Sequence, residues 1–160
     1  NERDNLGDDL PAEELNILVP GSPIEHYGWP YCYEDGLPNP EYPDAQRCAG
    51  KVGPALEMQA HSAPLGIVFY DHEQFPVEYR GDLFMAFHGS WNRSERTGYK
   101  VVRVEVEDGQ PISYDDFATG WLTESGTVAG RPVAVEVGPE GSLYVSDDGT
   151  GRIWRIRWAG

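Results

Sequence analysis

YRGDLFMA, residues 79–86, and PEGSLYVS, residues 139–146, are two copies of one pattern in this chain. Each copy has a glycine turn and then a strand of the form Leu-aromatic-aliphatic. An alternating strand with a central arginine follows, KVVRVEV in the first copy and RIWRIRW in the second, and a further strand precedes each copy within APLGIVFY and RPVAVEV. Sheet units of a few antiparallel strands that repeat along a chain are the blades of a β-propeller. The sequence therefore predicts an all-β fold made of propeller blades.

The composition agrees with an all-β fold. Glycine (19) and proline (13) account for 32 of the 160 residues and separate short runs rich in Val, Ile, Tyr, Phe and Trp, which is typical of strands joined by turns. PAEEL, residues 11–15, reads as a helical turn, with proline first and acids behind it. Residues 30 to 60 read as a long irregular insertion. The candidate strands are LNILV, GIVFY, DLFMAF, KVVRVEVE, VAVEV, SLYVSD and RIWRIRW.

The two copies differ in the length of one loop. From Gly81 to Gly141 the offset is 60 residues, whereas from Arg103 to Arg155 it is 52 residues. The first copy therefore carries eight extra residues, and they fall in HGSWNRSERTGY, residues 88–99. Loops that grow on a repeated scaffold usually carry function. We therefore expect functional side chains in this enlarged loop.

Charge and length argue against two kinds of partner. With 27 acidic and 12 basic side chains, the formal net charge is −15, so binding to a nucleic-acid backbone is electrostatically disfavoured. No apolar run approaches the roughly 20 residues that cross a bilayer, and no basic segment precedes an apolar one as in a signal peptide.

We expect residues 1–160 to form one partial propeller domain. Two or three blades do not close a ring and leave strand edges exposed, so further blades are expected upstream.

Cys32 and Cys48 flank a loop rich in proline and glycine, CYEDGLPNPEYPDAQRC. A disulfide that closes a loop of this length contributes on the order of 3 kcal/mol in the chain-entropy model, and it favours an oxidising compartment. Two free thiols are one alternative. A metal site is the other, although no histidine lies close to these cysteines in the pattern of a metal motif. The predicted location is periplasmic or extracellular.

Several segments resemble the C-terminal part of the sorbosone/glucose dehydrogenase family of quinoproteins, over nearly the whole chain. They are NERDNLGDDLPAEELN, YGWPYC, HSAPLGIVFY, FPVEYRGDLFMAFHGSWNRSERTGYKVVRV and GRPVAVEVGPEGSLYVSDDGTGRIWRI. The chain looks most similar to L-sorbosone dehydrogenase-like and fungal pyranose dehydrogenase-like members. The resemblance implies a six-bladed β-propeller that binds pyrroloquinoline quinone (PQQ) and a calcium ion at the top of the central channel. It also implies oxidation of a sugar or sugar aldehyde, hydride transfer to the quinone, and an external electron acceptor such as a cytochrome.

PQQ carries three carboxylates and an ortho-quinone, so it needs guanidinium or ammonium groups and a cation that polarises the accepting carbonyl. The resemblance implies that Arg131, in GRPV, binds a cofactor carboxylate, although Val133 replaces a second Arg found two residues later in glucose dehydrogenases. His88 stands where those enzymes have a cofactor-binding Lys, and Arg93 is the nearest permanent cation in the same loop. Either residue could instead order the loop through a hydrogen bond.

Further positions complete the predicted cofactor site. Trp91 is a candidate for stacking on the flat quinone, although a lone Trp is more often a packing anchor. His61, in AHSAPLG, precedes the strand GIVFY at the inner edge of a blade, where the family has a cofactor-contacting polar residue. NERD matches the segment whose backbone carbonyls bind calcium, so Asn1 is expected to face the cofactor, with Glu2 and Arg3 as carbonyl ligands of the metal.

Three short motifs match functional patterns but are more simply explained as turns or chance matches. GDD, residues 7–9, and SDDGTG, residues 146–151, could hold a cation, but Asp-Gly clusters are usually tight turns. Asn92-Arg93-Ser94 matches an N-glycosylation acceptor, a pattern with many chance matches.

The catalytic His of the family lies upstream of Asn1, so no residue here is assigned as the catalytic base. We expect the 160-residue piece alone to be inactive. A binding or scaffold propeller that has lost the cofactor is an alternative, which would explain Val133 and the replacement of Lys by His88. A calcium-dependent lactonase-type hydrolase is a third possibility, but it would need a metal-carboxylate centre that the sequence does not reveal.

Overall fold

A computed structural model describes residues 3–160, and this part of the chain is built of β-strands. It contains four antiparallel sheets, two of which have only two strands. Helical structure within residues 3–160 is limited to α1 (Ala45–Cys48) and a 3-10 turn at Val77–Tyr79. No described helix has the length and apolar character that a membrane crossing requires. The predicted all-β class is confirmed.

The larger sheet has four strands in the order β5 (Pro64–Phe69), β6 (Leu83–Phe87), β7 (Lys100–Glu107) and β8 (Gln110–Ala118). All five side chains of β6, LFMAF, are buried because other elements cover both faces of the sheet at this strand. β8, QPISYDDFA, is the outer strand, and each of its side chains is exposed or half-buried. This order, from an inner to an outer strand, is that of a propeller blade.

The second sheet repeats the arrangement with three strands, β9 (Pro132–Val137), β10 (Leu143–Asp147) and β11 (Arg152–Ile156). The registers of the two sheets correspond. Phe84 lies opposite Arg103 in the first sheet, and Tyr144 lies opposite Arg155 in the second. These are the aromatic and arginine positions of the sequence repeat, so the predicted pair of propeller blades is confirmed.

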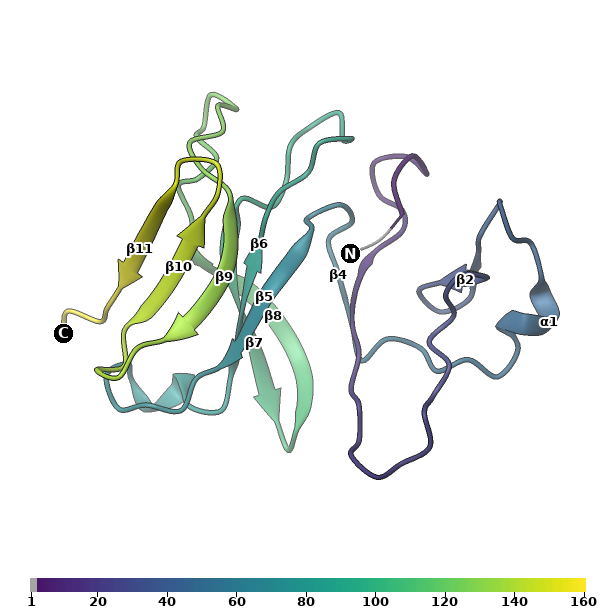
Figure 1. The fold of residues 1–160 in the computed structure, drawn as a ribbon, viewed down its shortest axis with the longest axis horizontal. Helices are drawn as coiled ribbons and strands as arrows, with labels where there is room; N and C mark the ends of the chain where they lie inside the picture. The colour runs from purple at the N-terminus through teal and green to yellow at the C-terminus, as the bar shows by residue number, and fades with distance from the viewer. Residues whose placement is uncertain (1–2) are drawn as a thin grey trace.

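One hairpin distinguishes the two blades. Residues 88–99, twelve residues, join β6 to β7, whereas residues 148–151, four residues, join β10 to β11. The difference is the eight-residue enlargement expected from the sequence. Both hairpins lie at the same end of the sheets, together with the connection 119–131, at the top of Figure 1. We call this end of the molecule the loop end.

The two blades stand side by side and share an apolar core (Figure 1). The inner strands β5 and β9 come so close that a Cβ added to Gly66 would lie 2.6 Å from Ala134 Cα and 2.8 Å from Val133 O. Only glycine permits this approach of two backbones. The buried core residues are Tyr70, Phe75, Phe84, Ala86, Tyr99, Val101, Trp121, Val135, Leu143 and Val145.

A two-stranded sheet, β1 (Glu13–Leu15) with β4 (Leu56–Met58), covers the other face of the larger blade through a second apolar cluster. The predicted helical turn at residues 11–15 is therefore wrong, and of the predicted strand LNILV only Leu15 lies in a strand. Strand pairing with β4 overrides the local helical preference, because a single helical turn is costly to nucleate and offers no comparable packing. The cluster consists of Met58, Leu83, Met85, Phe87, Val102 and Val104.

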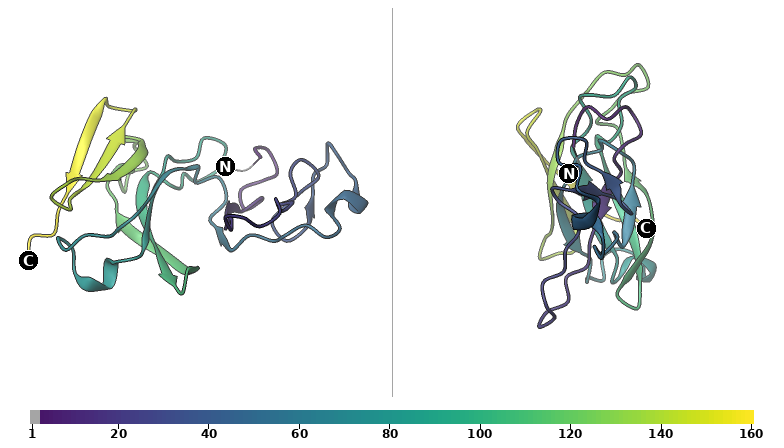
Figure 2. Two further views of the ribbon diagram at one scale, coloured as in Figure 1. Left: turned by 60° about the horizontal axis from the view of Figure 1, so that its bottom comes forward. Right: turned by 90° about the vertical axis from the view of Figure 1, so that its right-hand side faces the viewer.

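Residues 16–55 form an extension that contains only short elements, β2 (Cys32–Tyr33), β3 (Leu37–Pro38) and α1. The extension lies on the side of β1 and β4 that faces away from the C-terminus (Figure 2). A disulfide joins Cys32 to Cys48, whose Cα atoms are 6.0 Å apart, and ties α1 to β2. The irregular insertion expected at residues 30 to 60 falls largely within this extension, except for β4.

Candidate functional site

The enlarged loop is closed at its base by short backbone contacts. Ser90 N donates to Thr97 O at 2.9 Å, and Thr97 N donates to Ser90 Oγ at 3.0 Å. A Cβ added to Gly98 would lie 2.7 Å from Gly89 Cα, so glycine is needed where the two arms meet. Gly89 N also donates to Ser62 O at 2.9 Å. The base therefore fixes the tip of the loop over the start of β5.

A pocket of about 200 Å³ lies beneath this tip, between the enlarged loop, the segment before β5 and the first described residues of the chain. We call it the loop-end pocket. The sequence predicted two of its residues, His61 and Trp91, and did not predict the others. Its lining consists of Asp4, Glu13, His61, Ala63, Gly89, Trp91 and Asn92.

His61 belongs to a tightly constrained turn at the pocket. Its Nε2 donates to Gly7 O at 2.9 Å, and only 5% of the residue is exposed. His61 has a φ of 63° and Ala63 a φ of 54°, although neither is glycine. Left-handed conformations at such residues persist only where surrounding contacts impose them, and they concentrate at functional sites. Here Glu13 Oε1 accepts from Ala63 N at 2.8 Å and helps to hold the turn.

Asn92 is one of the pocket residues that the sequence did not predict. Both polar atoms of its side-chain amide are buried, and neither makes a hydrogen bond with the described residues. A buried polar group without a partner costs on the order of 1 to 3 kcal/mol, so such groups point to a missing ligand or water. The only sequence signal here was the Asn92-Arg93-Ser94 motif, and the burial of the amide argues against glycosylation.

Arg93 holds the N-terminal segment against the enlarged loop. Its guanidinium lies 3.3 Å from Asp9 Oδ1 and donates to Ala60 O at 3.4 Å and to Asp8 O. Ser94 N donates to Asp8 Oδ1 at 3.0 Å, and this bond lowers the pKa of the Asp8 carboxyl. The predicted cofactor residue Arg93 is therefore near the loop-end pocket but not in its lining. GDD, residues 7–9, is engaged by these contacts and by His61.

His88 and Arg131 lie together behind the Gly89 wall of the pocket. Arg131 Nη2 donates to Gly89 O at 3.0 Å, and its guanidinium lies over the Tyr99 ring at 5.6 Å. His88 Nε2 lies 3.0 Å from Asp148 Oδ1 in the opposite blade. Both residues thus tie the enlarged loop to the second blade. The structure brings the five predicted cofactor residues that lie within residues 3–160 to the loop end: His61, His88, Trp91, Arg93 and Arg131.

Asp147, at the end of β10, fixes the backbone on which Arg131 stands. It is buried and accepts from Arg131 N at 2.8 Å, from Thr150 Oγ1 at 2.7 Å and from Trp154 Nε1 at 3.0 Å. Burial alone would raise its pKa, but the hydrogen bonds from Arg131, Trp154 and Thr150 outweigh it and lower the pKa to about 2. SDDGTG is therefore a tight turn, as expected for an Asp-Gly cluster.

We expect Asp147 to make the stability of the protein depend on acid pH. A carboxyl with a depressed pKa stabilises the folded state fully above its ordinary value of 3.8, and this contribution disappears as the pH falls towards 2. Asp147→Asn should lower the free energy of unfolding by about 2 kcal/mol at pH 6 and by much less at pH 2.5. Urea unfolding at both pH values measures this difference. The exposed Asp108→Asn serves as the control, and equal losses at both pH values would contradict the assignment.

The predicted calcium ligands receive no direct test. Asn1 and Glu2 lie outside the described residues. The Arg3 side chain turns towards the extension, where it donates to Asn39 Oδ1 at 2.9 Å and pairs with Glu41 at 2.6 Å. Within residues 3–160, no three His, Cys, Asp or Glu side chains are grouped to hold a metal ion. Two carboxylates, from Asp4 and Glu13, do line the loop-end pocket.

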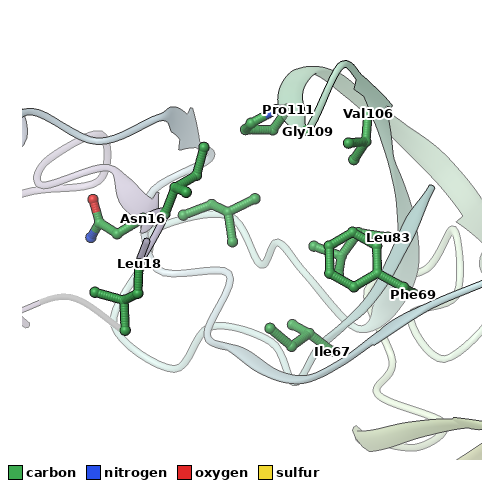
Figure 3. Close-up of a pocket in the computed structure, with 10 residues that line it drawn as sticks. Asn16, Leu18, Ile67, Phe69, Leu83, Val106, Gly109 and Pro111 are labelled. Carbon is green, nitrogen blue, oxygen red and sulfur yellow. The ribbon is translucent and has the colours of Figure 1, made fainter. Parts of the chain in front are cut away.

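A second pocket, of about 240 Å³, lies at the opposite end of β5 and has no catalytic chemistry (Figure 3). It separates residues 15–18 from the larger blade, and Ile67, Phe69 and Leu83 point into it. None of its lining residues is titratable at neutral pH. It is an apolar gap between packed elements, which leaves the loop-end pocket as the better candidate for a reaction site.

The loop-end pocket combines groups suited to a flat polar ligand. The indole of Trp91 offers an apolar face, the unpaired amide of Asn92 offers one donor and one acceptor, and the pocket also contains an imidazole. The carboxylates of Asp4 and Glu13 favour a cation at the same place. No arginine or lysine lines the pocket among the described residues, but the guanidinium of Arg131 contacts the carbonyl of the wall residue Gly89.

Comparison with known sequences finds relatives over nearly the whole chain. A family model described as TrAA12-like matches residues 1–159. An uncharacterized protein of Borreliella burgdorferi is 36% identical over 159 residues, which cover 98% of this chain and 41% of that protein. The pyrroloquinoline quinone-dependent pyranose dehydrogenase of Coprinopsis cinerea is 28% identical over 198 residues, which cover 98% of this chain and 26% of that enzyme.

Solved structures of similar proteins also align with nearly the whole chain. The calcium structure of the Trichoderma reesei carbohydrate-active enzyme of family AA12 has a TM-score of 0.75 and 26% identity, covering 92% of this chain and 43% of that one. The holo form of the PQQ domain of Coprinopsis cinerea pyranose dehydrogenase has a TM-score of 0.74 and 27% identity, covering 99% and 47%. The chain thus spans less than half the length of each of these relatives.

Proposed function

The chain belongs to the TrAA12-like family, whose relatives include sugar oxidoreductases, and from this premise we propose that it is the C-terminal part of a PQQ-dependent sugar dehydrogenase. The observation that carries the proposal is the loop-end pocket, which the enlarged loop roofs at the start of an inner strand. The missing length, relative to the family, would supply the remaining blades of a six-bladed propeller. The disulfide between Cys32 and Cys48 supports a periplasmic or extracellular location.

The residues of the loop-end pocket fit PQQ together with a cation. Trp91 can cover a flat ring system, and Asn92 has an amide with both polar atoms unused by the described residues. A ligand with three carboxylates would be repelled by Asp4 and Glu13 unless a cation lay between them. Calcium prefers such oxygen ligands, so the pair of carboxylates is consistent with a calcium ion beside the quinone.

PQQ would supply the two-electron acceptor for a hydride from the reacting carbon of the sugar. The residues of this chain would bind and shield it: Trp91 as a wall, Asn92 and His61 as hydrogen-bonding groups, and Arg131 as a positive charge behind Gly89. A general base is also required for the oxidation, and we assign it to a part of the protein outside this chain. An external carrier, such as a cytochrome, would accept the electrons.

The test uses the complete protein loaded with PQQ and calcium. We expect it to reduce an artificial dye when given aldoses or sorbosone, and we expect the 160-residue piece to show no turnover because it lacks the base. PQQ binding is measured separately by titration of the apo protein. A complete protein that binds PQQ without saturation and reduces no dye over a broad sugar panel would refute the proposal.

A propeller that has kept the fold and lost the cofactor is the second candidate. It is favoured by the contacts of three predicted cofactor residues, because Arg93, Arg131 and His88 are all engaged by protein groups. Saturable PQQ binding by the apo protein would exclude it. A lactonase-type hydrolase finds less support, since the described residues contain no cluster of three metal-ligating side chains.

A further inference from the structure

An open groove of about 710 Å³ runs beside the loop-end pocket, on the outer side of the enlarged loop. Trp91 and residues 93–96 form one wall, and residues 122–126 of the connection between the blades form the other. Trp91 lines both the groove and the loop-end pocket, so the two spaces are neighbours. A sugar bound in the groove would therefore lie next to a cofactor held in the pocket.

The wall formed by residues 122–126 is an ordered turn that presents hydroxyl groups. Gly126 N donates to Thr123 O at 2.9 Å, and Thr123 N donates to Thr127 O at 3.0 Å. The hydroxyls of Thr123 and Ser125 are 2.9 Å apart. Arg96 Nη1 donates to Gly126 O at 2.8 Å and so links the two walls. These bonds hold the polar groups of the groove in place before any ligand arrives.

The charges of the groove favour a neutral ligand. Arg93 and Arg96 are balanced by Glu95 and Glu124 in the lining. The positive charge of Arg93 is further compensated by Asp9. The groove therefore has no surplus of positive charge for a phosphate or an acidic polymer, and the net charge of −15 for the chain opposes such ligands as well.

One large apolar surface stands among these polar groups. Trp91 is 69% exposed, so its indole is accessible to a ligand in the groove. An exposed indole beside carboxylates, guanidinium groups and hydroxyls matches a polyhydroxylated ring, whose C–H face packs on the indole while its hydroxyls bond to the polar groups. The same features suit successive rings of a neutral glycan.

We infer that this groove binds the chain of a neutral oligosaccharide and places its terminal ring beside the loop-end pocket, which the proposed function assigns to PQQ. The inference rests on the proposed function for the identity of the reacting ring, and it narrows the substrate class from free monosaccharides to the ends of glycan chains. Trp91 is the platform on which the terminal ring packs.

The first test measures binding without chemistry. Gluco-, xylo- and manno-oligosaccharides of two to five rings are reduced to alditols, which lack the free anomeric carbon that a dehydrogenase oxidises and keep the remaining rings that the groove would bind. Titration calorimetry with the complete apo protein should give dissociation constants of about 1 mM or lower that improve with chain length. Trp91→Ala and Ser125→Tyr, which fills the groove, should each weaken binding about tenfold. Ser22→Tyr, on an exposed turn of the extension, should leave binding unchanged.

The second test uses turnover by the PQQ- and calcium-loaded complete protein. The ratio of kcat/KM for an oligosaccharide to kcat/KM for its monosaccharide should exceed one and fall about tenfold in Ser125→Tyr. Alditol binding without any dye reduction would support the groove while refuting the proposed dehydrogenase. Monosaccharide turnover with no alditol binding across the panel up to about 10 mM would overturn the groove inference alone. Binding restricted to oligomers of acidic sugars would also overturn it.

Discussion

Gly66→Val is expected to lower the free energy of unfolding by about 3 kcal/mol, because it places a side chain between two backbones. The added Cβ alone would lie 2.6 Å from Ala134 Cα and 2.8 Å from Val133 O on the neighbouring strand β9. Neither contact can be relieved by rotating a side chain, so β5 and β9 must separate. Separation would loosen the apolar core that the two blades share. Urea unfolding followed by tryptophan fluorescence measures the loss.

Two further glycine variants sharpen this prediction. Gly66→Ala adds the Cβ without the two methyl groups and should fall between the native protein and Gly66→Val. Gly53→Ala is the matched control, because its Cβ would meet nothing closer than Asp35 Oδ1 at 3.6 Å, and its effect should stay within about 0.5 kcal/mol. If Gly66→Val unfolds at the same urea concentration as the native protein, the inner strands do not touch in solution.

The blades could be predicted from the sequence because the repeat is encoded locally. Each copy marks its central strand with a turn glycine followed by Leu, and β6 and β10 both begin at that Leu. The arginine of the next strand then falls opposite the aromatic residue in both blades. These features depend on residues close together in sequence, so the sequence pattern alone is enough to predict them.

Elements that depend on distant partners could not be predicted in this way. β8, with two adjacent acids and a proline, lacks a strand-like pattern and owes its conformation to pairing with β7 along its whole length. β1 lies within a stretch that favours a helical turn, and its pairing with β4 joins residues more than forty positions apart. In both cases long-range pairing overrides local preference.

The candidate site, like the fold, could be predicted from the sequence only in part. The eight-residue difference between the repeats located the enlarged loop, and its position over β5 followed from the blade topology. The contacts of its side chains did not follow, because they involve the N-terminal segment and the second blade. Asn92 gave no signal of a binding role, since its importance lies in a buried amide that makes no hydrogen bond with the described residues. Arg93 was a candidate cofactor ligand because it is a permanent cation in the loop, and in the structure it is paired with Asp9.

Arg131→Leu is expected to weaken PQQ binding by the complete protein about 100-fold, or about 2.7 kcal/mol. Two effects add in this variant. The guanidinium is a positive charge behind the pocket wall, and its loss removes attraction for an anionic ligand. Its bond to Gly89 O (3.0 Å) also holds the wall in place, so the enlarged loop should lose order. Equilibrium titration of the apo protein with PQQ measures the first effect, and amide hydrogen exchange over residues 88–99 measures the second.

Arg131→Lys separates the two contributions, because lysine keeps the charge but lacks the fork that reaches the loop carbonyls. It should restore part of the PQQ affinity while amide exchange in the enlarged loop remains fast. Arg157→Leu, at an exposed position near the C-terminus, removes a like charge without touching the site and should change neither measurement. A native affinity in Arg131→Leu would contradict the placement of PQQ beside this residue. If Arg131→Leu combines native PQQ affinity with fast amide exchange in the enlarged loop, Arg131 only links the two blades and does not bind PQQ.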